Sequence, residues 1–533
     1  MQILHRFKVN TCRLIAIVLV YAFLCPQWVY ALDDVNRSVK IQVSRNTLSP
    51  ELSIYDAQVQ EFFSVGDQNR PLEGKNILFT SFRFDFTHNL GGKSSLDGVS
   101  LETIKWIKIF RKMGARIFCY AGEIIPTDFD LIDGFKVNEN VHFRSDTING
   151  SERIEQVFKL NRDMDNAFKR GYLNDQEMKN IKKMQQEIAD DLLKYMNENN
   201  IDLVVSENSN AYPGNLPFAL ALKDATKGIK FISHGHDYPW ERKKFIIAPG
   251  SNLDDLLKKM LNGKKVNTAV INTSQKKELE KFNMDSIIVP NVMDFDNPPV
   301  IDKEKLTAFR KHFSLDPEKD VLVLLPVRPI QRKNIDTSLE LVKLIMKQAK
   351  QRMPGKNIKV MVTHPSGDED PEYWQNLKQK AREEGIELLD VGDPKDQGQG
   401  AEIFELSIAY AACDITFFLS TLEGWGNGLI ESFYYKKPIV VYPYYVYMTD
   451  IKKVGPDCIE VEKATEAKAA QIIDLLLDKE KIKKVVDYNY EVGQKFFSFR
   501  ILREKLLPFI KEVISVKNNN SLEERSFIID RAI

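Results

Sequence analysis

The chain reads Ser420-Thr421-Leu422-Glu423-Gly424-Trp425-Gly426-Asn427-Gly428-Leu429-Ile430-Glu431-Ser432-Phe433 directly after a short apolar run, 415–419. The apolar run predicts a buried strand, and the residues from about Gly428 onward predict a helix. Glycines at alternate positions let a ligand approach the loop closely, and the start of a helix attracts anions. Glu423 and Glu431 are suited to accept hydrogen bonds from hydroxyl groups. The stretch therefore predicts a strand, a loop and a helix that bind a phosphate group together with sugar or ribose hydroxyls.

Short apolar runs alternate with amphipathic stretches on both sides of this unit. In 181–195, for example, apolar residues recur three or four positions apart, as expected for a helix. Strands that alternate with helices predict parallel sheets covered on both faces, with ligands bound beyond the carboxyl ends of the strands. We therefore predict an α/β protein with two Rossmann-like, doubly wound domains that face a cleft. The expected strands are 76–81, 115–120, 202–206, 230–233, 269–272, 286–290, 321–326, 359–363, 387–391, 415–419, 439–442 and 458–461.

The alternation is interrupted at Pro290-Asn291-Val292 and in the polar stretch 294–299. Proline and polar residues between two regular patterns indicate a boundary between domains. We therefore place the first domain at 75–297 and the second at 298–487, with a polar N-terminal extension at 32–74.

The composition narrows the class of protein. The 533 residues include 75 Lys+Arg and 75 Asp+Glu, so the formal net charge is zero, and 28% of the residues are charged. Zero net charge argues against a nucleic-acid binder that relies on a positive field, and the apolar share argues against disorder or several membrane spans. The five cysteines show no CxxC spacing, so neither a disulfide framework nor a zinc knuckle is expected.

The first 31 residues have the three parts of a secretory signal peptide. Arg6, Lys8 and Arg13 precede the apolar run 14–25, and small residues suited to signal peptidase end at Ala31. The alternatives are an uncleaved membrane anchor, for which a 12-residue run is short of the roughly 20 needed to span, and a misleading start. Cations before the run favour a translocated body on the secretory route, either periplasmic or extracytoplasmic or membrane-anchored, whereas a misleading start implies a cytoplasmic protein.

A glycine pair follows the first expected strand. Gly91 and Gly92 lie before an amphipathic helix and can form a phosphate-binding or acceptor-side loop. Gly92-Lys93-Ser94 also resembles the end of a Walker A motif, although Thr87 stands where the first glycine belongs. A P-loop that uses Lys93 and a plain surface turn therefore stay as alternatives.

Two histidines, His234 and His236, lie at the end of the expected strand 230–233. Because alternate residues of an extended chain point to one face, the two rings can act together. A histidine held by the neighbouring Asp237 can donate a hydrogen bond to a sugar hydroxyl. A metal site is an alternative, but no third ligand is visible in the sequence, and simple packing at the strand end is another.

Arg328 and Lys333 leave the end of the expected strand 321–326 five positions apart. Two cations at a strand end can converge on a diphosphate and neutralise it as a leaving group. The alternative is a charged loop that faces only water.

Together these motifs resemble the retaining, nucleotide-sugar-dependent glycosyltransferases of the family-4 type, which have the GT-B fold. Glu423 and Glu431 match the E-x7-E motif of that family, and Arg328 and Lys333 match its R-x4-K pair. Gly91-Gly92 matches the acceptor-side glycine loop, and Pro290-Asn291 matches the entry to the second domain. The likeness covers roughly residues 75–513.

The resemblance implies sugar transfer from a nucleoside diphosphate donor with retention at the anomeric carbon, and no cofactor or required metal. It implies that the first domain binds the acceptor, which is a glycan, a lipid or a small molecule, and that the second binds the donor. A helical segment at 488–513 would return to the first domain, followed by a tail at 514–533. A P-loop nucleotide hydrolase and a non-catalytic carbohydrate-binding relative are the alternative functions, and the N-terminus allows membrane association.

The same resemblance assigns roles to individual residues. Arg328, Lys333 and the loop amides would hold the diphosphate, Glu431 the ribose and Glu423 the donor sugar. His236 or His234 would contact the sugar hydroxyls. The remaining donor-binding residues it implies are Gly424, Gly426, Asn427, Gly428 and Leu429.

Overall fold

This computed structural model contains two sheets of parallel strands, and helices pack on them. It describes residues 70–85, 98–125, 141–144, 163–261, 267–364, 371–391 and 405–515. The predictions for the N-terminal segment and for Gly91, Gly92 and Lys93 lie outside the described residues. Within the described ranges, no helix has the length and apolar character that crossing a membrane requires.

The first sheet has the strand order β3-β2-β1-β4-β5-β6-β7, and every pairing is parallel. Alternate residues of β1 face opposite layers: Ile77 and Phe79 pack in one core with α4 (Gly98–Lys112), and Leu78 packs in the other with α7 and α8. A capping box between Asn174 and Glu177 begins α7. The strands are β1 (Asn76–Asp85), β2 (Arg116–Ile125), β3 (Val141–Arg144), β4 (Leu203–Glu207), β5 (Lys230–Gly235), β6 (Asn267–Val270) and β7 (Ser286–Ile288). The helices that connect successive strands from β3 to β7 are α7 (Asp175–Glu198), α8 (Leu216–Ala225), α9 (Asn252–Leu261) and α10 (Thr273–Lys281).

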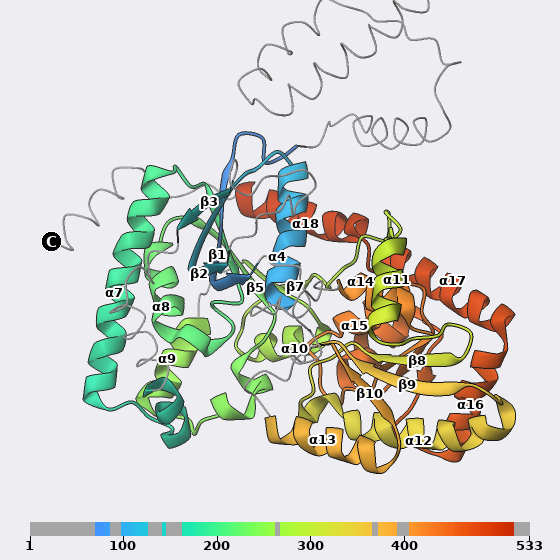
Figure 1. Cartoon of the computed structure of the whole chain (residues 1–533). Helices are drawn as coiled ribbons and strands as arrows, with labels where there is room; N and C mark the ends of the chain where they lie inside the picture. Colours follow the sequence, from blue (N-terminus) through green and yellow to red (C-terminus); the bar gives the residue numbers. More distant parts are fainter. Residues whose placement is uncertain are drawn as a thin grey trace, which may run out of the picture. The chain divides into compact units, whose positions relative to one another are not determined.

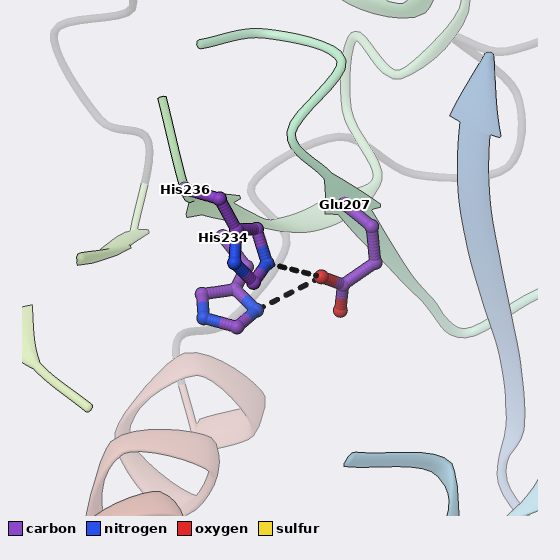
Figure 2. Close-up of side chains that lie close together, drawn as sticks. All are labelled: Glu207, His234 and His236. Atoms are coloured by element: carbon purple, nitrogen blue, oxygen red, sulfur yellow. Dashed lines mark hydrogen bonds and ion pairs between the residues drawn. The ribbon is translucent and has the colours of Figure 1, made fainter. Parts of the chain in front are cut away.

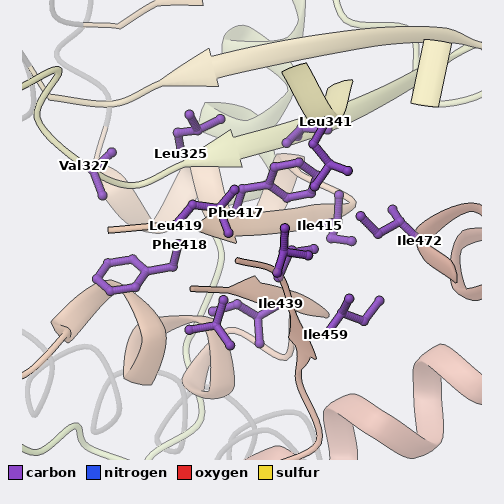
Figure 3. Close-up of a cluster of buried hydrophobic side chains, with 14 of the residues drawn as sticks. Leu325, Val327, Leu341, Ile415, Phe417, Phe418, Leu419, Ile439, Ile459 and Ile472 are labelled. Carbon is purple, nitrogen blue, oxygen red and sulfur yellow. The ribbon is translucent and has the colours of Figure 1, made fainter. Parts of the chain in front are cut away.

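The second sheet has the order β10-β9-β8-β11-β12-β13 and is also parallel. Its larger core includes Leu325, Phe417 and Ile439, with Leu341 and Ile472 from the helices (Figure 3). The strands are β8 (Asp320–Leu325), β9 (Asn357–Val362), β10 (Glu387–Asp390), β11 (Ile415–Phe418), β12 (Ile439–Val441) and β13 (Ile459–Glu460). The helices are α11 (Lys303–His312), α12 (Ile335–Arg352), α13 (Pro371–Glu383), α14 (Leu406–Ala412), α15 (Asn427–Tyr434), α16 (Glu466–Leu477), α17 (Lys479–Phe496) and α18 (Phe499–Ser515) (Figure 1).

Two segments connect the sheets. The chain from β7 carries Val292 into the core of the first sheet and Phe295 into that of the second. A Cβ on Gly493 of α17 would overlap the Phe295 ring, so this close approach requires glycine. After α17 ends, α18 packs against α4, as Figure 1 also shows. Leu502 and Leu506 of α18 belong to the first core.

The predicted doubly wound α/β class is confirmed, because strands occur at each expected position and form two parallel sheets. The structure adds one strand, β3, that we did not predict. Because β3 pairs only with β2 at the edge of the sheet, its Val-His-Phe-Arg sequence forms no apolar run.

Candidate functional site

The loops after β8 and β11 meet in the second sheet because these strands are neighbours. The Thr421 amide donates to the Arg332 carbonyl at 2.9 Å, and the Arg332 guanidinium donates to the Leu422 carbonyl at 3.0 Å. Parallel strands end at the same edge of a sheet, so the basic loop and the glycine loop lie side by side.

Lys333 and Glu423 form an ion pair between the Lys333 Nζ and the Glu423 Oε1 atoms. Their side chains are only 11% and 10% exposed. Arg332 adds a second cation, with Nη1 3.4 Å from Glu423 Oε2. Burial raises the pKa of Glu423, but Lys333 and Arg332 outweigh burial and hold this pKa below its ordinary value. Glu423 is therefore an ionised hydrogen-bond acceptor beside two cations, and Arg332 is a site residue that sequence reasoning missed.

His364 is another residue of this edge that we did not predict. It follows β9, the neighbour of β8, and its Nδ1 lies 2.7 Å from the Thr363 hydroxyl oxygen. Burial, with smaller contributions from the charges of Lys333 and Arg328, lowers the pKa of His364 to about 4. A neutral imidazole therefore lies near both predicted diphosphate-binding cations.

Glu431 lies within α15 and is held by a tyrosine. The Tyr410 hydroxyl lies 2.9 Å from Glu431 Oε2 and 3.1 Å from the Gly428 carbonyl. Burial raises the pKa of Glu431, and the Tyr410 hydrogen bond lowers it in part. The fully buried Tyr410 therefore sets the position of the carboxylate that the resemblance assigns to the ribose.

The glycine loop is shaped by the packing of its own chain. Gly426 has φ +112°, and a Cβ there would overlap the hydroxyl of Tyr444, which donates to the Trp425 carbonyl at 2.6 Å. A Cβ on Gly428 would lie 2.9 Å from the Phe418 ring. These two glycines are therefore needed for internal packing, whatever ligand approaches the loop.

Two residues in the first turn of α15 also face the protein. Leu429 is fully buried in the core of the second sheet, so only its backbone can face a ligand. Asn427 accepts a hydrogen bond at 2.9 Å from Asn291, which lies in the segment that connects the sheets.

The two predicted histidines meet a residue that the sequence did not reveal. His234 Nδ1 lies 2.9 Å, and His236 Nε2 3.2 Å, from the same Oε2 atom of Glu207 at the end of β4 (Figure 2). The side chains of His234, His236 and Glu207 are 1%, 6% and 0% exposed. Asp237, which we expected to hold the histidines, instead pairs with Arg242 at 2.6 Å.

The charge state of this cluster follows from its burial. Desolvation lowers the pKa of His234 to about 4, so its imidazole is neutral near pH 7. Burial raises the pKa of Glu207, but the two histidines reverse this effect and hold the pKa below its ordinary value. Glu207, His234 and His236 also have possible metal-ligand atoms within 4.8 Å of one another. Glu207 is thus the third possible ligand that was not visible in the sequence.

The histidine cluster and the glycine loop lie next to each other. A Cβ on Gly424 would lie 3.4 Å from the His236 carbonyl oxygen. Asn272, the N-cap of α10, donates to the Gly424 carbonyl at 2.7 Å. The Thr273 amide donates to Asp450 at 2.9 Å, which adds a second bond between the first and second domains. The structure thus brings the predicted His236 together with the predicted glycine loop.

Comparisons with known proteins agree with this architecture. Residues 308–492 match the family described as glycosyl transferases group 1. A mannosylglucosylglycerate synthase of Thermotoga maritima is 30% identical over 456 residues, 79% of this chain and 99% of the relative. A protein of the same name from Petrotoga mobilis is 26% identical over 439 residues, 76% of this chain and 97% of the relative.

A solved structure extends the likeness to the fold. Anabaena HepE in complex with UDP-glucose superposes with a TM-score of 0.51 at 12% identity, over 82% of this chain and 99% of HepE. This match supports the two-domain GT-B fold. Because the Thermotoga relative is matched over nearly its whole length, the chain belongs to the group 1 glycosyltransferases and is a GT-B glycosyltransferase.

Proposed function

We propose that this glycosyltransferase takes a sugar from a nucleoside diphosphate donor and transfers it with retention of anomeric configuration. The observation that carries the proposal is the buried pair of Lys333 and Glu423, flanked by Arg332 and the glycine loop. The cations suit a diphosphate, and the ionised carboxylate suits the hydroxyls of the sugar attached to it. Anabaena HepE, which has the same fold, has been solved with UDP-glucose.

Each predicted residue has a part in this reaction. Arg328 and Lys333, with the amides of the glycine loop, hold the diphosphate, while Glu431 holds the ribose and Glu423 the donor sugar. His236 or His234 contacts the sugar hydroxyls. The acceptor oxygen attacks the anomeric carbon from the side of the leaving group as the bond to the diphosphate oxygen breaks. The acceptor proton passes to that departing oxygen, so the reaction requires no metal.

The two relatives point to a substrate class. Both are named mannosylglucosylglycerate synthase. We therefore propose a mannosyl nucleoside diphosphate as donor and a small, negatively charged glycoside, glucosylglycerate, as acceptor.

The test combines product analysis with a variant of the donor site. The enzyme is incubated with GDP-mannose or UDP-glucose, with and without glucosylglycerate, and proton NMR records the anomeric signal of the product. We expect an α-linked product from the α-linked donor, unchanged by EDTA, and its loss in Glu423→Ala. A β-linked product would contradict retention, and loss of the product with EDTA would contradict metal independence. If neither GDP-mannose nor UDP-glucose is turned over, the proposed donor class is wrong.

For the N-terminus we propose translocation, with cleavage after Ala31 and, if cleavage fails, membrane association. The support is the order of charges around the short apolar run. A reporter enzyme fused after residue 40 is expected to be active outside the cytosol. Activity confined to the cytosol would contradict translocation.

A further inference from the structure

The Glu207 carboxylate is the shared partner of two histidine rings. Figure 2 shows both rings turned toward one oxygen of Glu207, at the 2.9 and 3.2 Å distances given above. In the sheet, Glu207 and His234 are direct neighbours, because β4 and β5 pair in that register. Trp106 of α4 stacks on His234 with ring centroids 4.0 Å apart, which fixes the plane of that ring.

The protons of this cluster can be assigned from its geometry. An ionised carboxylate only accepts hydrogen bonds, so both nitrogens that face Glu207 carry a hydrogen. A neutral His234 then has a bare Nε2, and this buried atom has no hydrogen-bond donor among the residues that the structure describes. By the same count, a neutral His236 donates from Nε2 to Glu207 and leaves Nδ1 as a hydrogen-bond acceptor.

The backbone around His236 is fixed from two sides. Asn208, at φ 60°, accepts hydrogen bonds from the amides of His236 and Asp237, each at 3.0 Å. Gln275 donates to the His236 carbonyl at 2.9 Å, on the side where Gly424 lies. The backbone of His236 is therefore held beside the glycine loop, while Glu207 holds its ring.

We propose that Glu207 is a positioning residue that fixes the tautomers of His234 and His236, so that His236 presents Nδ1 as an acceptor to a sugar hydroxyl. This inference rests on the proposed sugar transfer and reverses the direction of the hydrogen bond expected from the sequence, in which the histidine donates. The substrate group that it selects is a hydroxyl that can donate. Glu207 itself acts only through the histidines.

A metal ion is the competing occupant of the same three side chains. Coordination between them would require His234 Nδ1 and His236 Nε2 to lose their hydrogens. The hydrogen of a neutral His234 would then be on Nε2, for which the described part of the chain offers no acceptor. Ligating histidines normally donate their second ring N–H to a carboxylate, a carbonyl or a water, and His234 has no such acceptor among the described residues. The hydrogen-bonded cluster is therefore favoured over a metal centre.

The first experiment reads the tautomers directly in the full-length enzyme without substrate. Nitrogen-15 NMR of histidine-labelled protein at pH 7.5, assigned with His234→Gln and His236→Gln, is expected to show Nδ1–H for His234 and Nε2–H for His236. The opposite tautomer, or a doubly protonated His236, would overturn the inference. Addition of Zn²⁺ is expected to leave these signals unchanged, whereas stoichiometric binding that shifts both would establish the metal site instead.

The second experiment links the tautomers to turnover. Glu207→Gln is compared with Glu177→Gln, a matched change at a buried glutamate of α7 that accepts from the Asn174 amide at 2.9 Å. We expect kcat to fall about 10- to 100-fold in Glu207→Gln, by analogy with the loss of groups that orient metal-ligating histidines. The histidine signals should change with it, the Kd for UDP and GDP should stay the same, and Glu207→Asp should recover part of kcat.

Two results would refute the positioning role: a kcat for Glu207→Gln within about twofold of Glu177→Gln, or a loss of kcat with unchanged histidine signals. Failure of the proposed function has a different signature. If the unaltered enzyme binds neither UDP nor GDP, the donor class is wrong, and the tautomer assignment is judged by the NMR data alone.

Discussion

Replacing Lys333 by Met tests the proposed donor site at a buried charge. The substitution keeps most of the apolar stem but removes the cation that pairs with Glu423. It therefore has two separable effects: the diphosphate loses a charged donor, and the Glu423 carboxylate loses its nearest counter-charge.

The size of each effect follows from the contacts. Breaking a buried ion pair by removing one partner costs about 3–5 kcal/mol, and because Arg332 stays at 3.4 Å from Glu423 we expect about 2–3 kcal/mol here. At about 2–4 °C per kcal/mol for a domain of this size, the Tm of the second domain should fall by about 4–12 °C. Loss of a charge-assisted hydrogen bond should weaken UDP or GDP binding by about 10²-fold.

The double variant Lys333→Met/Glu423→Gln separates these effects. Two neutral side chains need no counter-charge, so its stability should return to within about 1 kcal/mol of wild type. Its nucleotide affinity should stay low, because the cation for the diphosphate is still missing. Urea unfolding measures stability, and isothermal titration calorimetry with UDP and GDP measures affinity. Wild-type affinity in the single variant, or affinity regained in the double variant, would refute the assignment of Lys333 to the diphosphate.

The pH dependence gives an independent check of the pair. The pKa of Glu423 is lowered in the folded protein, so its contribution to stability is present above the unfolded-state pKa of about 4.3 and is lost as pH falls through the lower folded-state value. Lys333→Met should reduce this acid-dependent loss of stability. Identical pH profiles for the variant and wild type would contradict the pairing.

Three further changes test neighbouring contacts. Tyr410→Phe removes the hydroxyl that lies 2.9 Å from Glu431 Oε2, and it should weaken UDP binding about tenfold in calorimetry. If binding of a 2′,3′-dideoxy nucleotide is weakened equally, Glu431 does not contact the ribose hydroxyls. Asp450→Asn weakens the hydrogen bonds from Thr273 and should lower the free energy of unfolding, measured in urea, by about 1 kcal/mol. An unchanged free energy of unfolding would argue against this contact between the domains. Burial raises the pKa of Glu241 to about 7, so wild-type stability should fall as pH rises from about 4.3 to 7. Glu241→Gln should remove that fall. If urea unfolding shows the same change in stability between pH 5 and pH 8 for wild type and variant, Glu241 is not the cause.

The sequence was most informative where a buried strand leaves a continuous apolar run. β8 is buried along its whole length, so residues 321–325 show no polar interruption. The edge strand β3 has no such signature. Arg328, Lys333 and the two glutamates could be placed near one another because strand ends converge at one edge of a parallel sheet.

Contacts between side chains could not be predicted in the same way. Glu207 follows Leu203-Val204-Val205-Ser206, and a carboxylate at the end of a buried strand is a signal in itself, but only the register of β4 against β5 places it beside His234. The glycines at 426 and 428 were predicted to admit a ligand, yet Tyr444 and Phe418 already require them. One sequence feature can thus serve packing and binding, and only the neighbours distinguish the two.

The pairing of Lys333 with Glu423 also has a consequence for donor binding. In the free enzyme the cations and the carboxylate neutralise each other, which avoids leaving a buried charge unpaired. The proposed donor, a nucleoside diphosphate sugar, would replace both partners: its phosphates would take the place of Glu423 at the cations, and its hydroxyls would take the place of the cations at Glu423. A ligand with only one of these groups, such as inorganic diphosphate or the free sugar, leaves one side of the pair unsatisfied. If the proposed donor is correct, the pair of Lys333 and Glu423 therefore favours the complete donor over its fragments.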